Sequence, residues 1–105
     1  MLTLTCATNF ASDLAARGEH QRAYEVDAET LRRSRDVLGS EHASTLACAL
    51  NLSFDLRALG RNGESDRLFD EVIDAYRRTL GPEHPAIVAA RAGMRANCDV
   101  DPMPL

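Results

Sequence analysis

The chain carries the same sequence pattern twice, at a spacing of 42 residues. When residues 3–44 are aligned with residues 45–86 without a gap, 15 positions are identical. The identical pairs include Leu4/Leu46, Cys6/Cys48, Asn9/Asn51, Asp13/Asp55, Leu14/Leu56, Gly18/Gly60, Gly39/Gly81 and His42/His84. A repeat of this length is typical of stacked architectures, in which one unit cannot bury its apolar face without a neighbour. The repeat therefore constrains the fold class before any single residue is considered.

Each repeat has the pattern of two helices joined by a glycine turn. Apolar residues recur at three- and four-residue spacing, which predicts helices over roughly 2–16 and 19–37 in the first repeat. In the second repeat, the first helix is expected to end at Gly60, which supplies the left-handed backbone conformation that follows many helices. Its second helix is expected to end before Gly81-Pro82, and a fifth helix is predicted over roughly 85–97.

These elements predict an all-α fold, a short right-handed superhelical solenoid of antiparallel helix hairpins. The expected organisation is a repeat domain over 1–98, with repeat one at 3–44, repeat two at 45–86 and a capping helix at 85–97, followed by a flexible tail at 99–105. Arg91 and Arg95 replace small residues of the earlier repeats, so we expect no further helix to pack on that face of the last helix.

Composition excludes several classes of function. The net charge of −4 argues against a nucleic-acid partner, which needs a basic surface. No apolar run has the length of a membrane span, and the first residues lack the pattern of a signal peptide. Cys6 and Cys48 recur at the repeat spacing, which is typical of buried packing residues in a reducing compartment. We therefore expect a cytoplasmic protein without a membrane partner.

Candidate catalytic and metal-binding residues have a simpler structural interpretation. His42 and His84 each follow a glutamate, but one copy per repeat is typical of the loop between repeats, and the two lie too far apart to share an ion. Cys48 has no evident His or Asp partner that would activate it as a nucleophile. No phosphate-binding glycine loop is present. We predict no catalytic residues, no metal and no cofactor, and hence no enzyme.

Two segments carry a family resemblance. Residues 51–60 (NLSFDLRALG), followed by residues 80–85 (LGPEHP), resemble the 42-residue tetratricopeptide repeat of the kinesin-light-chain type, over about residues 3–97. More narrowly, the chain is similar to the C-terminal repeats of actinobacterial, and so bacterial, tetratricopeptide proteins. The resemblance implies a non-catalytic module that binds a peptide or protein partner in a concave groove lined by the first helix of each repeat.

The resemblance also implies which side chains would line that groove. Counting back from the turn glycine gives the candidate peptide-binding residues Asn9, Ser12, Leu50, Asn51, Phe54 and Arg57. The two asparagines would hydrogen-bond a peptide backbone, Arg57 would attract an acidic group, and Leu50 and Phe54 would supply apolar surface. An alternative is that Asn9 and Asn51 hold adjacent helices together or hydrogen-bond the local backbone. In the fifth helix the same offsets give Ala89, Ala92, Gly93 and Ala96.

A second function is compatible with the sequence. Residues 2–11 (LTLTCATNFA) lack a capping residue and are as small and apolar as an interior repeat. The chain would then be the structural C-terminal end segment of a larger regulatory or peptide-maturation protein. In that case it would mediate self-association only, as a homo-oligomer formed through residues 1–35.

Overall fold

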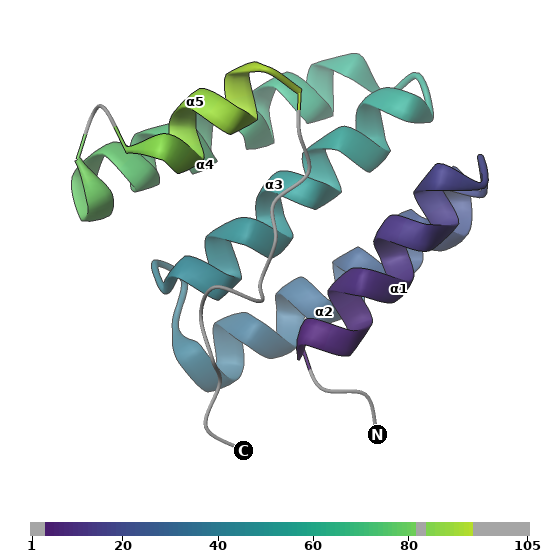
Figure 1. Ribbon diagram of the computed structural model, residues 1–105, viewed down its shortest axis with the longest axis horizontal. Coiled ribbons are helices and arrows are strands. Elements are labelled where there is room, and N and C mark those ends of the chain that lie inside the picture. Colours follow the sequence, from purple (N-terminus) through teal and green to yellow (C-terminus); the bar gives the residue numbers. More distant parts are fainter. Residues whose placement is uncertain (1–3, 82–83, 94–105) are drawn as a thin grey trace.

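The computed structural model describes residues 4–81 and 84–93, and within these ranges the chain is helical without strands. The helices are α1 (Leu4–Ala16), α2 (His20–Leu38), α3 (Ala43–Ala58), α4 (Asn62–Leu80) and α5 (Pro85–Arg91). Each packs against the next helix in the sequence. Figure 1 shows two layers, with α1, α3 and α5 in front and α2 and α4 behind. The predicted all-α solenoid of helix hairpins is confirmed.

Matching glycine turns join the helices within each repeat. Gly18 and Gly60 adopt φ values of +80° and +82°, the left-handed region in which a side chain is strained. After α3, the N–H of Arg61 donates to the carbonyl of Leu56 and the N–H of Gly60 donates to that of Arg57. After α1, Glu19 and Gly18 make the equivalent bonds to Leu14 and Ala15. These paired bonds satisfy carbonyls at the helix end and reverse the chain tightly, as predicted for Gly60.

The last helix is shorter than expected from the sequence. It ends at Arg91 and is followed by a turn, in which Gly93 has a φ of +82° and donates its N–H to the carbonyl of Ala90. A left-handed residue at this point ends the helix, so the predicted extension to residue 97 is wrong at Ala92 and Gly93. Residues 94–97 and the predicted tail at 99–105 lie outside the described residues.

The centre of the molecule is α3. Of its 16 residues, 12 are buried, and they are distributed around the whole helix. A helix that is apolar or small on every side is typical of a fully enclosed position, here between α2 and α4. Cys48 is completely buried, and its Sγ lies 3.8 Å from the hydroxyl of Ser34 on α2. The predicted packing role of this cysteine is consistent with that position.

Candidate functional site

The family resemblance places a ligand groove on the layer formed by α1, α3 and α5. Few residues of α3 are exposed there, because 12 of its 16 residues are buried. The residues of α3 that are not buried are Ala43 at its start and Phe54, Arg57 and Ala58 near its end. Any contact that α3 makes with a ligand is therefore concentrated near its C-terminal end.

Two of the predicted groove residues lie in the interior. Leu50 is 2% exposed and Asn51 is 0% exposed. The reason is that α3 is enclosed by the helices on either side, so positions that could face a groove in an open array face protein here. A buried amide has to be hydrogen-bonded within the protein, and Asn51 has such an interaction. For Asn51 the burial favours the alternative, an interaction within the protein, and Leu50 is a core residue.

Phe54 is half-buried at the edge of α3. Its ring packs against that of Phe69 on α4, with the ring centroids 6.4 Å apart and the planes tilted by 47°. This tilted geometry is favourable for two aromatic rings and fixes the orientation of Phe54. The part of the ring that remains accessible is a rigid apolar surface, which costs little entropy to use in binding.

Arg57 lies one helical turn further along and is exposed. Its guanidinium donates to the carboxylate of Asp66 on α4 at 3.1 Å, and both side chains are more than half exposed. An ion pair this exposed contributes little to stability and exchanges readily with other partners. Arg57 is therefore positioned by Asp66 and still available to an acidic group on a ligand.

On α1, the equivalent positions are more open. Asn9 is exposed and Ser12 is half-buried, in contrast to the buried Asn51. The sequence-based list missed Phe10, which is 41% exposed beside Asn9. Its counterpart in the second repeat is Leu52, which is only 9% exposed. The signal that could have pointed to Phe10 was the apolar character of residues 2–11, which is that of an interior repeat.

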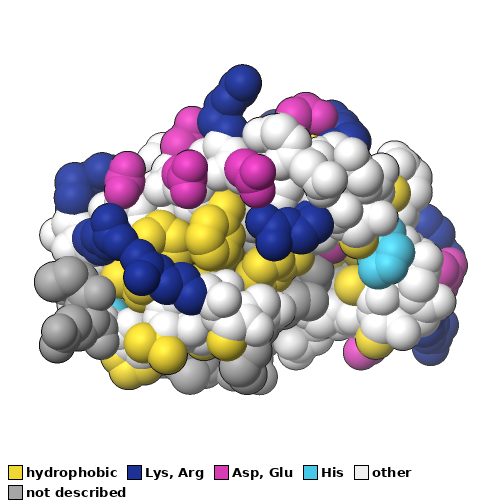
Figure 2. Space-filling view, turned by 90° about the horizontal axis from the view of Figure 1, so that it is seen from above, with side chains coloured by type: hydrophobic (Ala, Val, Ile, Leu, Met, Phe, Trp, Pro, Cys, Tyr) yellow, Lys and Arg dark blue, Asp and Glu magenta, His cyan; other side chains and the backbone are white. Residues whose placement is uncertain are grey.

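The opposite end of the stack also exposes apolar side chains. Val88 of α5 is 64% exposed, whereas Leu46, at the same position in α3, is 5% exposed beneath α4. Figure 2 looks onto α4 and α5 and shows apolar side chains gathered between acidic and basic ones. Arg91 is exposed. Of the remaining positions on this helix, Ala89 is half-buried, while Ala96 lies outside the described residues.

A polar cluster around Arg61, the residue that precedes α4, links the two repeats. The guanidinium of Arg61 lies 5.0 Å from the ring centre of Tyr24 on α2, a cation–π contact. It also donates to both carboxylate oxygens of Glu64, at 2.6 and 2.8 Å. These hydrogen bonds lower the pKa of Glu64 and raise the pKa of Arg61. The cluster stabilises the packing of α2 against the α3–α4 turn.

The described residues include no cluster of metal-ligating side chains. Among them there is no group of three His, Cys, Asp or Glu side chains that could hold an ion. His42 instead caps α3, because its Nδ1 accepts the N–H of Ser44 at 3.1 Å. Within the same residues, no helix combines the length and the apolar character needed to cross a membrane.

Comparison with known proteins identifies the repeat. The sequence model of the tetratricopeptide repeat matches residues 3–44 and again residues 45–86. The chain belongs to the tetratricopeptide repeat family. Tetratricopeptide repeats generally mediate protein–protein interactions and typically act as non-catalytic scaffolds. Searches of curated proteins and of solved structures gave no match.

Proposed function

We propose that this tetratricopeptide repeat chain is a non-catalytic interaction module that binds a peptide or protein partner on the face formed by α1 and α3. The observation that carries the proposal is the pair at the end of α3, where a half-buried phenylalanine lies one turn from an exposed arginine. Figure 1 shows that α1 and α3 run in the same direction in the front layer. Asn9 and Ser12 are exposed or half-buried at the repeat positions of Asn51 and Phe54, and would add groups that can hydrogen-bond a peptide backbone.

The chemistry of this surface favours a partner with one apolar and one acidic side chain close together. Phe54 offers a fixed aromatic surface, and aromatic residues often dominate the energy of binding at interfaces. Arg57 offers a planar donor group that pairs well with carboxylates, in exchange for its exposed contact with Asp66. Leu50 and Asn51 support this surface from beneath rather than contacting the partner.

A random peptide library selected against the whole chain tests the proposal. We expect enriched peptides to combine an acidic and an apolar residue, and Arg57→Glu to abolish their capture while leaving the helical content unchanged. Arg77→Glu is the matched control, because Arg77 is an exposed arginine of α4 remote from this surface in sequence. Selection of peptides without acidic residues, or equal capture by Arg57→Glu, would show that the surface is assigned incorrectly.

Self-association through residues 1–35 is the second candidate function, and the exposure of Phe10 favours it. A large aromatic side chain at the open side of α1 can be covered by a second copy of the chain. Light scattering coupled to size exclusion should then show a dimer that Phe10→Glu converts to a monomer. A monomer at every accessible concentration of the unmodified chain would exclude this function.

A further inference from the structure

The sequence contains one Asn-Gly pair, Asn62-Gly63, and the fold places it where the chain enters α4. Such a pair usually forms a tight turn, but here the two residues begin a helix. Gly63 is the only one of the six glycines without a positive φ, and a Cβ added to it would meet nothing within 4 Å. Neither the backbone conformation nor the packing therefore requires a glycine at this position.

The two groups of this pair that can react with each other are both accessible. Asn62 is exposed, and its side-chain amide makes no hydrogen bond with the described residues. The N–H of Gly63 belongs to the first turn of α4, where N–H groups have no partner within the helix. Arg61, the residue before the helix, does not cap it with its side chain. The nitrogen of Gly63 is therefore not held in a hydrogen bond beside the side-chain carbonyl of Asn62.

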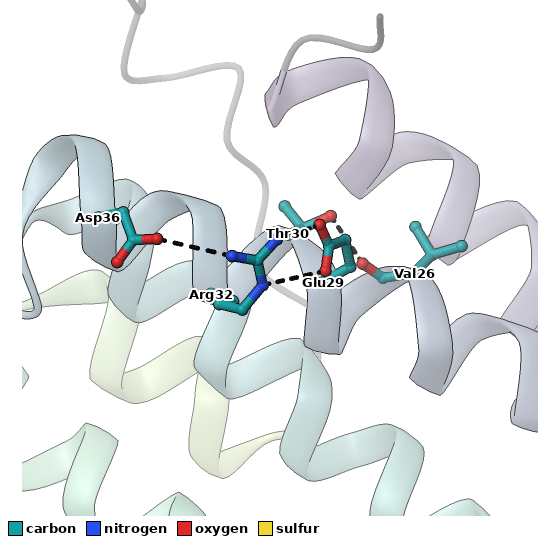
Figure 3. A network of polar contacts seen from close by, with 5 residues as sticks. All are labelled: Val26, Glu29, Thr30, Arg32 and Asp36. Atoms are coloured by element: carbon teal, nitrogen blue, oxygen red, sulfur yellow. Dashed lines mark hydrogen bonds and ion pairs between the residues drawn. The ribbon is translucent and has the colours of Figure 1, made fainter.

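Polar side chains in the middle of α2 are restrained by their neighbours. Figure 3 shows Arg32 between Glu29 and Asp36, with N···O distances of 2.6 and 3.7 Å. Backbone N–H groups in the interior of a helix also donate to carbonyls one turn earlier, which keeps their nitrogens from reacting. Asn62 has no comparable side-chain contact, so its side chain can rotate toward the main chain.

We propose that Asn62 is a site of spontaneous deamidation, with Gly63 as the nucleophile. The backbone nitrogen of Gly63 attacks the side-chain carbonyl carbon of Asn62, its proton passes through solvent to the departing amide nitrogen, and ammonia leaves. The product is a five-membered succinimide ring, which water then opens at either carbonyl. Opening at the side-chain carbonyl gives aspartate, and opening at the main-chain carbonyl gives isoaspartate. Glycine favours the attack because no side chain shields its nitrogen.

The modification changes the start of α4 in two ways. Both products place a carboxylate in the first turn, where the helix dipole favours a negative charge. Isoaspartate also adds one atom to the main chain between Arg61 and Ser65. The N–H of Ser65 donates to the carbonyl of Arg61 at 3.0 Å, and its hydroxyl donates to the carbonyl of Ser53 on α3 at 2.7 Å. The isoaspartyl product therefore loosens the contact between α4 and α3, independently of the proposed peptide surface.

Incubation of the whole chain in warm, weakly alkaline buffer, followed by peptide mapping with mass spectrometry, tests the site. We expect the mass gain of an amide-to-acid conversion at Asn62. Asn9 and Asn51 should stay intact, because larger residues follow them and Asn51 is also buried. A synthetic peptide of residues 59–66 reports the rate of the same pair without the fold. A chain that stays intact at Asn62 while this peptide converts, or conversion at Asn9 ahead of Asn62, would overturn the proposal.

Substitution of the glycine tests its role as the nucleophile. Gly63→Ala fits the open space at this position and favours the helix, so the fold should be retained. Because the methyl group hinders the nitrogen, the variant should slow conversion of Asn62 about tenfold, which corresponds to about 1.4 kcal/mol in the barrier. Gln21→Ala is the matched control, because Gln21 is the exposed residue at the same position in repeat one, and it should leave the rate unchanged. Equal rates for Gly63→Ala and the unmodified chain would refute the assigned role of Gly63.

Hydrogen exchange at Ser65 tests the structural consequence. Asn62→Asp reproduces the aspartyl product and keeps the main chain, so the amide of Ser65 should exchange at the rate of the unmodified chain. In the isoaspartyl chain purified after incubation, the same amide should exchange about tenfold faster, the effect of losing about one hydrogen bond. Equal exchange at Ser65 in all three chains would show that the modification does not loosen the start of α4.

Discussion

The first helices of the two repeats, α1 and α3, share much of their sequence but differ in what they bury. Asn9 and Asp13 of α1 are exposed, whereas the identical residues Asn51 and Asp55 of α3 are 0% and 1% exposed. The difference follows from position, because α3 packs closely against both α2 and α4, whereas α1 packs closely against α2. A repeated residue therefore takes its environment from its neighbours in the stack, and the same asparagine can be a surface residue in one repeat and a core residue in the next.

The largest expected effect concerns a leucine that both repeats bury. Leu56 is 5% exposed and Leu14 is 2% exposed at the same repeat position. Leu56→Ala should lower the free energy of unfolding by about 2–5 kcal/mol through the cavity it leaves. Leu14→Ala should cost less, because α1 is held closely on one side and can shift to fill the space. Urea denaturation of both variants measures the difference, and a larger loss for Leu14→Ala would contradict the comparison.

Substitution of the two asparagines should distinguish the buried position in α3 from the exposed position in α1 more clearly, although the loss of stability is smaller than for the leucines. Asn51→Ala removes a buried, hydrogen-bonded amide and should destabilise the chain by about 1–3 kcal/mol, because its partner is left without a bond. Asn9→Ala changes an exposed side chain and should stay within about 0.5 kcal/mol. Thermal unfolding of the pair measures this contrast. Equal effects would mean that the burial of Asn51 does not matter for stability.

Substitution of the two turn glycines should lower the stability equally in both repeats, so these variants serve as an internal reference. Gly18 and Gly60 have the same left-handed backbone and the same pair of hydrogen bonds. An alanine would be strained by about 1–2 kcal/mol in this conformation, offset in part by the lower entropy of its unfolded chain. Gly18→Ala and Gly60→Ala should therefore each cost about 1 kcal/mol. A difference well above that between the two, measured by urea denaturation, would show that the turns are not equivalent.

The sequence was sufficient to predict the parts of the fold that depend on local order. The spacing of apolar residues predicted the helices, and Gly60 predicted the turn, because both effects act within a few residues of the chain. The 42-residue spacing then predicted the stacking of hairpins. The end of α5 was predicted too far along the chain, since the left-handed turn at Gly93 was not recognised.

The candidate site was harder to predict because burial depends on residues distant in the sequence. Asn9 and Asn51 occupy the same repeat position, and nothing in their local sequence indicates that one is exposed and the other enclosed. The exposure of Phe10 likewise arises from how whole helices pack. Offsets copied from one repeat to another therefore predict which side of a helix a residue lies on, but not whether a ligand can reach it.

The smallest effect concerns two ion pairs whose charges are reversed between the repeats. Arg61 and Glu64 open the second helix of repeat two, whereas Glu19 and Arg22 occupy the same positions in repeat one. Arg61 makes two hydrogen bonds to Glu64 and also stacks on Tyr24, whereas Arg22 makes one bond to Glu19. All four side chains are at least 36% exposed, so neither pair should contribute much to stability.

The measurable quantity is therefore the pKa of Glu64, which its hydrogen bonds with Arg61 lower. A carboxyl with a lowered pKa in the folded state stabilises the fold above its unfolded pKa, and this contribution is lost as the pH falls through the folded value. Arg61→Gln should thus raise the pKa of Glu64 in a carboxyl-carbon titration, while Arg22→Gln should leave it unchanged. The destabilisation by Arg61→Gln should shrink in acid without vanishing, because contact with Tyr24 is lost at every pH. If the pKa of Glu64 is the same in all three chains, the two ion pairs are equivalent, and their reversal has no effect on how the repeats join.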